Sequence, residues 1–170
     1  MRVLQRKSKN PLVSPRTLRV IFLLLILGSA SARATELSIT RVFTGWRDAS
    51  SFKRISEYFT GRENSGGTLI RRTQPDQRSG YYFLVRVENA GVSLPVKLEV
   101  ELILPNTIPA RIHTFSAELK SGKNVVNLGL TGADWPSVET NPVAWKINLL
   151  GPAGEVLATE KSYLWEKPAQ

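Results

Sequence analysis

The sequence predicts an all-β protein built as an antiparallel β-sandwich of about seven or eight strands, with one short helix near residues 50–60. Short segments in which apolar and polar residues alternate recur along the chain at intervals of about 8 to 15 residues. Glycine, proline, asparagine and serine, the residues of tight turns, fill the connections between them. Strands that alternate with long helical segments would indicate a parallel sheet. The sequence does not show this alternation.

The first element is a secretory signal peptide, which we predict for residues 1–34. A basic leader ends at Arg19, the segment 20–27 is continuously apolar, and small residues follow up to Ala32-Arg33-Ala34. A membrane-spanning helix needs about 20 apolar residues, whereas the apolar part of a signal peptide has about 7 to 15. The length therefore favours cleavage between Ala34 and Thr35 over an uncleaved membrane anchor. A less favoured cleavage site of the same type is Ala30-Ser31-Ala32.

Removal of this segment changes the charge of the protein. The first 34 residues hold seven Lys or Arg and no Asp or Glu, so the formal net charge falls from +9 for the whole chain to +2 for residues 35–170. The net charge therefore predicts no nucleic-acid partner, and we expect no stable membrane insertion after cleavage.

The remaining 136 residues suit one β-sandwich domain, which we place at residues 35–165, followed by a short C-terminal tail at 166–170. The chain has no cysteine, so the domain depends on core packing without disulfides. Together with the leader, these features indicate an exported protein of the periplasm or the extracellular space, in a bacterium.

Three segments show the clearest strand pattern. In the segment 95–105, Val96, Leu98 and Val100 share one face, and Lys97 and Glu99 share the other. The same alternation predicts strands at 81–89 and 143–150. Weaker patterns predict further strands at 37–43, 68–73, 112–119, 125–130 and 156–164.

The segment 50–60 departs from the strand pattern. Phe52, Ile55 and Phe59 recur at the spacing of one helix face, Ser50 or Ser51 can cap the start, and Gly61 can end the helix. This spacing predicts an amphipathic helix of about two to three turns on the edge of the sandwich. A strand with Ile55 and Phe59 inward is the alternative.

From residue 81 to residue 165, the chain resembles the immunoglobulin-like and fibronectin III-like domains of exported proteins. The resemblance rests on the strand LEVELIL, the tryptophan strand AWKINLL and the C-terminal hairpin 144–165. Antibody domains pair their buried tryptophan with two cysteines, which this chain lacks, so the resemblance is to the broad superfamily. It implies the sandwich fold and assigns no active-site residues.

The sequence predicts no catalytic residue, no metal site and no cofactor. His113 is the only histidine and lies in a predicted strand without the motif of a serine nucleophile. Glu99 and Glu101 share one strand face, as a glycosidase pair could, but that face also carries Lys97 and is predicted to be solvated. A small hydrolase is therefore the least favoured function.

Two tryptophans and one arginine-rich segment are candidate binding features. Trp46 and Trp135 lie in predicted loops, where an exposed indole can stack on a sugar or anchor a partner, and a buried one can cap the core. Both alternatives stay open. The segment 70–82 mixes arginines with tyrosines, but Arg71 and Arg72 are adjacent and point to opposite faces of a regular strand. A strand–loop–strand without a polyanion site is the favoured interpretation.

We therefore expect an exported, non-catalytic protein with a binding or structural role, whose partner is a protein or a glycan that the sequence does not identify. A carbohydrate-binding module that uses Trp46 and Trp135 is the alternative.

The first prediction is that the exported protein begins at Thr35, because the small-residue site ends at Ala34. Intact-mass measurement of the protein recovered from outside the cytoplasm checks it. A mature species that retains residues 20–27 would contradict the predicted compartment.

Overall fold

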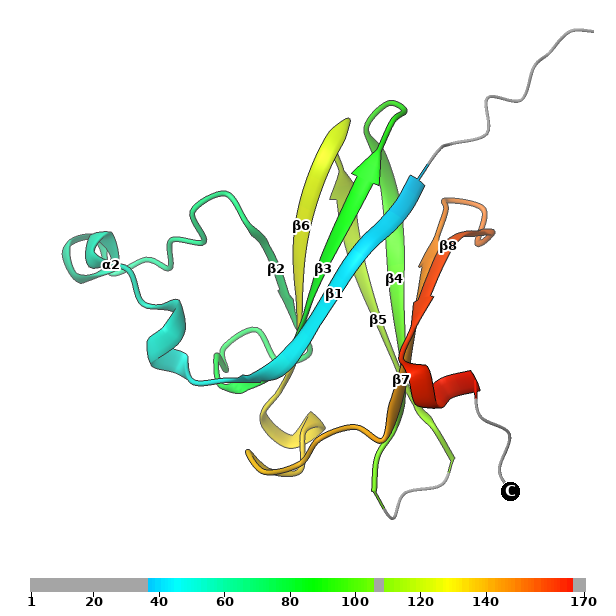
Figure 1. The fold of residues 1–170 in the computed structure, drawn as a ribbon. Coiled ribbons are helices and arrows are strands. Elements are labelled where there is room, and N and C mark those ends of the chain that lie inside the picture. The colour runs from blue at the N-terminus through cyan, green and yellow to red at the C-terminus, as the bar shows by residue number, and fades with distance from the viewer. Residues whose placement is uncertain (1–36, 106–108, 167–170) are drawn as a thin grey trace, which may run out of the picture. The chain divides into compact units, whose positions relative to one another are not determined.

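Two four-stranded sheets face each other across the core of the protein (Figure 1). The computed structural model describes residues 37–105 and 109–166. The first sheet consists, in spatial order, of β1 (Leu37–Arg47), β3 (Gly80–Asn89), β6 (Gly122–Thr131) and β2 (Leu69–Arg72). The second consists of β5 (Arg111–Leu119), β4 (Leu94–Ile103), β7 (Ala144–Leu150) and β8 (Val156–Lys161). The predicted β-sandwich is confirmed.

The order of the strands is that of an immunoglobulin-like sandwich. The chain stays in one sheet from β1 to β3, crosses to β4 and β5, returns to β6, and crosses again to the hairpin of β7 and β8. This is a Greek-key arrangement with four strands in the second sheet, as in fibronectin III-like domains. β2 is an addition to that plan. It pairs with β6 in parallel. The sequence predicts an antiparallel sandwich, and the first sheet departs from this prediction at β2.

The core fills the space between the sheets with apolar side chains from alternate strand positions. In β4, Leu98 and Val100 are fully buried, and Leu98 lies opposite Leu149 of β7 and Phe115 of β5. The predicted alternation in β3, β4 and β7 is confirmed. The strands and core side chains of the described residues all follow Thr35 in the sequence, so a chain that begins at Thr35 retains them.

A buried asparagine joins two turns at one end of the sandwich. The side chain of Asn89 accepts a hydrogen bond from the Gly91 amide at 2.9 Å. It donates to the carbonyl of Val92 at 2.8 Å and to that of Lys120 at 3.1 Å. Asn89 thereby ties the turn between β3 and β4 to the turn between β5 and β6, and its polar atoms are satisfied without water.

The connection from β1 to β3, residues 48–79, is the largest departure from a plain sandwich. It contains a 3₁₀ turn at Ala49–Phe52, the helix α2 at Ile55–Thr60, and β2. Gly61 ends α2 in the left-handed conformation with φ of 65°, as predicted. We name this connection the β1–β3 excursion.

The predicted short helix near residues 50–60 is present as α2, but it is shorter than expected because a separate 3₁₀ turn covers Ala49–Phe52, and the predicted cap is wrong. Asp48 and Arg54 occupy the two N-cap positions, without a capping side-chain hydrogen bond, in place of Ser50 or Ser51. Of the three apolar residues on the predicted face, only Phe52 is buried, whereas Ile55 and Phe59 are exposed. The sequence spacing was helical, but α2 lies too far from the sheet for its apolar side to be covered.

The C-terminal hairpin is shorter than predicted. β8 ends at Lys161 and a 3₁₀ turn covers Tyr163–Glu166, so Trp165 lies outside the strand. The pairing of β7 with β8 shifts register at Leu149/Leu150, and β8 lies at the edge of its sheet. Across residues 37–105 and 109–166, no helix is long and apolar enough to cross a bilayer.

The second prediction compares neighbouring residues of β4 in the chain that begins at Thr35. Leu98→Ala should lower the free energy of unfolding by about 2–5 kcal/mol, because it leaves a cavity between the sheets. Lys97→Ala removes an exposed side chain and should change it by less than about 0.5 kcal/mol. Chemical denaturation under reducing conditions measures both. Equal losses would contradict the observed register.

Candidate binding surface

The outer face of the first sheet, turned away from the core, concentrates aromatic and cationic side chains. Its residues come from alternate positions of three strands: Arg41, Phe43, Gly45 and Arg47 of β1, Tyr82, Leu84, Arg86 and Glu88 of β3, and Lys123, Val125, Asn127 and Gly129 of β6. We name this surface the outer face. The β1–β3 excursion covers one end of it and leaves the other end open.

At the covered end, the ring of Tyr82 lies in the space that Gly129 leaves free. A Cβ atom on Gly129 would come within 2.4 Å of the Tyr82 ring, so only glycine fits at this position. Phe52 of the excursion packs over the same ring, with 4.7 Å between the ring centres. Tyr82 is consequently only 1% exposed although its side chain points away from the core.

Arg72 connects this aromatic pair to the ion pairs of the excursion. Its Nε donates to the Tyr82 hydroxyl at 2.8 Å, and its guanidinium lies 5.1 Å from the centre of the Phe52 ring. The two terminal nitrogens of Arg72 donate to the Glu63 carboxylate at 2.6 and 2.8 Å. The Tyr82 hydroxyl in turn donates to the carbonyl of Arg78 at 2.7 Å. Arg78 also pairs with Glu57 of α2.

These contacts shift the pKa values of Glu63, Arg72 and Tyr82. The hydrogen bond from Arg72 lowers the pKa of Glu63 below its ordinary value of 4.5. The same bond raises the pKa of Arg72, and burial raises the pKa of Tyr82. The charges of Arg72 and Arg78 are therefore balanced by Glu63 and Glu57 within the fold. The segment 70–82 forms the strand–loop–strand that the sequence favours, because β2 ends at Arg72 and β3 begins at Gly80.

At the open end, two guanidinium groups lie close to the ring of Phe43. The guanidinium carbon of Arg41 is 5.5 Å from the centre of the Phe43 ring, and that of Arg86 is 5.3 Å from it. Phe43 is 45% exposed, and the side chains of Arg41 and Arg86 are also exposed. Val125 of β6 is exposed on the same face. This end of the outer face therefore combines positive charge with apolar surface.

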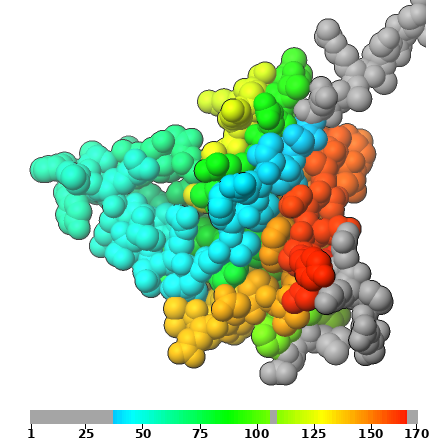
Figure 2. All heavy atoms as spheres, in the orientation of Figure 1, coloured from blue at the N-terminus to red at the C-terminus, as the bar shows by residue number. Residues whose placement is uncertain are grey.

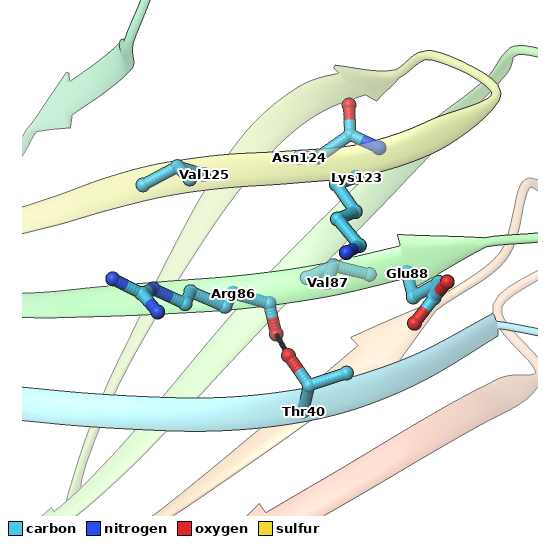
Figure 3. A pocket seen from close by; sticks show the side chains of 7 residues that line it. All are labelled: Thr40, Arg86, Val87, Glu88, Lys123, Asn124 and Val125. Atoms are coloured by element: carbon cyan, nitrogen blue, oxygen red, sulfur yellow. Dashed lines mark hydrogen bonds between the residues drawn. The ribbon is translucent and has the colours of Figure 1, made fainter.

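Two shallow hollows lie along these strands, and Phe43 lines the second of them. The first, of about 360 Å³, is lined by Thr40, Arg86, Glu88, Lys123 and Val125, among others (Figure 3). In Figure 3 the Lys123 side chain reaches from β6 toward β3, and the Thr40 hydroxyl donates to the carbonyl of Arg86 at 3.3 Å. The second, of about 240 Å³, lies further along β1 and β3 and is lined partly by Phe43 and Trp46.

A bulge in β1 brings these residues together. The pairing of β1 with β3 shifts by one residue between Ile39 and Arg41, which places Arg41 directly opposite Arg86. Sequence reasoning missed this site because the alternation in 37–43 does not reveal the bulge. The mixture of arginine and phenylalanine in the segment 41–47 was the available signal.

The two candidate tryptophans occupy different environments. Trp46 lies in β1 and not in a loop; it is half-buried, and its Nε1 donates to Asp48 at 3.2 Å. Trp135 is 4% exposed and stacks on the core residue Tyr81, with 4.4 Å between ring centres. Trp135 therefore caps the core, the second of the two alternatives, and offers no free ring face to a ligand.

The remaining polar candidates have structural surroundings. His113 is half-buried in β5, where burial lowers its pKa. Glu99 and Glu101 both accept hydrogen bonds from the Asn148 side chain, at 3.3 and 3.0 Å, and Glu101 pairs with Lys146. In the part of the chain that the structure describes, no three His, Asp or Glu side chains gather as metal ligands would.

Comparison with solved structures finds a similarity to an immunoglobulin-like protein from Pseudomonas aeruginosa. The two chains are 16% identical with a TM-score of 0.33, and the similarity covers 76% of this chain and 96% of that chain. Comparisons with protein-family models and with curated proteins find no match.

The third prediction concerns acid stability. Because the pKa of Glu63 is lower in the folded chain than its ordinary value of 4.5, its ionised form stabilises the fold above that pH. This contribution is lost as the pH falls from 4.5 through the folded pKa. Glu63→Gln should lower the free energy of unfolding at pH 7 and weaken its pH dependence below 4.5.

Urea denaturation between pH 7 and pH 3 measures this effect. Glu139→Gln, at an exposed position, is the control and should follow the unmodified protein throughout. An unchanged pH profile in Glu63→Gln would show that the ion pair with Arg72 does not contribute to stability.

Proposed function

We propose that the protein is an exported, non-catalytic binding module, and that the open end of the outer face binds an acidic segment of a partner protein. The single observation that carries this proposal is the exposed Phe43 ring with the guanidinium groups of Arg41 and Arg86 close to it. Arginine and aromatic residues are enriched where proteins bind one another, because they combine a large contact area with directional polar groups.

The charge of the surface supports an acidic partner. Arg41, Arg86 and Lys123 contribute three cations to the open end, and Glu88 is the one acidic side chain among its outward residues. The guanidinium groups already lie against Phe43, so part of their conformational freedom is lost before a partner arrives. Carboxylates of the partner can then accept bidentate hydrogen bonds from a preorganised pair of arginines.

Export is supported by the first 34 residues, which combine a basic leader, a short apolar segment and a small-residue cleavage site. The glycan alternative has less support. Trp135 is buried, and Trp46 is half-buried with its Nε1 bonded to Asp48, so the pair does not form a platform for sugar rings.

The fourth prediction tests the outer face with defined probes. Poly-L-glutamate should bind the chain that begins at Thr35, and Arg41→Ala/Arg86→Ala should weaken this binding roughly tenfold. Isothermal titration calorimetry measures the dissociation constant. Both arginines are exposed, so the double variant should keep its fold.

The matched control is Lys97→Ala/Arg111→Ala, which removes two exposed cations from the second sheet and should bind as the unmodified protein does. Equal weakening in both double variants would show binding to net charge alone and contradict the proposed face. Binding of cello- or chito-oligosaccharides with quenching of tryptophan fluorescence would favour the glycan alternative instead.

A further inference from the structure

The end of the β1–β3 excursion exposes three large apolar side chains on one short helix. Ile55 and Tyr58 are each 78% exposed and Phe59 is 85% exposed. They occupy positions i, i+3 and i+4 of α2, which share one side of a helix. We name this group the apolar tip. No buried residue occurs in α2, so its apolar side is not used to build the core.

The charged side chains near the tip form two groups: the acidic ones are in ion pairs, and the basic ones beside α2 are not, within the part of the chain that the structure describes. Glu57 and Glu63, the acidic residues closest to the tip, form ion pairs with Arg78 and Arg72 of the segment that leads back to the sandwich. Lys53, Arg54 and Arg62 flank α2 and are exposed. None of these three cations forms an ion pair with the described residues. The tip therefore presents apolar side chains surrounded by unbalanced positive charge.

The tip also extends away from the rest of the described fold. In Figure 1 the segment that carries α2 projects outward on the side of β2, and the space-filling view shows it standing clear of the two sheets (Figures 1 and 2). A projecting element can meet a flat surface before the rest of the sandwich does. The same element offers little area to a globular partner.

The surface area that the tip can bury favours a membrane over a protein as its partner. A large apolar side chain buries at most about 150–250 Å². A stable protein interface needs about 800 Å² on each partner, more than three side chains supply. A bilayer surface requires less, because partial burial of a few apolar side chains adds to the attraction between nearby cations and anionic headgroups.

We propose that the apolar tip docks the protein reversibly on an anionic phospholipid surface. Ile55, Tyr58 and Phe59 enter the boundary between headgroups and acyl chains, and Lys53, Arg54 and Arg62 lie against the phosphate groups. The Tyr58 hydroxyl can stay at the wet level of the headgroups while its ring is buried. This peripheral contact involves no membrane-spanning segment, and it leaves the outer face free for a partner.

The fifth prediction is tested by vesicle flotation with the chain that begins at Thr35. This chain lacks the apolar segment 20–27. The protein should float with vesicles in which about one third of the phosphatidylcholine is replaced by phosphatidylglycerol, and much less with phosphatidylcholine alone. Ile55→Ser/Tyr58→Ser/Phe59→Ser should reduce flotation roughly tenfold or more. Lys53→Gln/Arg62→Gln should remove the preference for phosphatidylglycerol.

The control is Val92→Ser/Val138→Ser/Val156→Ser, which removes three exposed apolar side chains away from α2 and should float as the unmodified protein does. Arg41→Ala/Arg86→Ala should also float normally, which separates this inference from the outer face. Thermal melts establish that each variant is folded.

A reporter at the tip gives a second readout. Phe59→Trp should show a blue shift of fluorescence on addition of phosphatidylglycerol vesicles, whereas Val92→Trp, at an 80% exposed position, should not. Absence of flotation, or equal flotation of the two triple variants, overturns the proposal. Self-association that is lost in the tip variant, without flotation, would assign the tip to a second copy of the chain and also overturn it.

Discussion

The hydrogen bond from Arg72 to the Tyr82 hydroxyl joins the β1–β3 excursion to the sandwich. Tyr82 can be reached only because Gly129 leaves space for its ring, and Phe52 then covers the ring from outside. Arg72 in turn balances Glu63 and lies beside Phe52. The buried side chain of Tyr82, on the outer side of the sheet, thus holds the excursion in place. It thereby determines which part of the outer face the excursion covers and where α2 lies.

The sequence predicts the sandwich well because its strands are half-buried. In β4 the alternation of apolar and polar residues follows directly from one face packing on the core, so the inward position of Leu98 can be read without a structure. The same reasoning fails for α2. A helical spacing of Phe52, Ile55 and Phe59 indicates which residues share a side, but not whether anything lies against that side.

The candidate surfaces escape sequence reasoning for related reasons. The group of Phe43, Arg41 and Arg86 depends on a bulge in β1, and neither local composition nor alternation indicates which residue is the extra one. Trp135 follows a glycine-containing turn, and its place in the sequence does not show whether it is exposed, whereas in the structure it closes the end of the core against Tyr81. In both cases the decisive contact joins residues far apart in the chain.

The parallel pairing of β2 with β6 has a consequence for how the folded protein avoids association with other molecules. The strand β6 carries the apolar run Val125, Val126 and Leu128, and in a plain sandwich its outer edge would present open backbone groups beside these residues. Such an edge is a template for the strands of other molecules. β2 occupies it with only four residues, two of them arginines, and Arg71 also donates to the carbonyl of Ser116. The excursion thereby shields an aggregation-prone edge by intramolecular pairing.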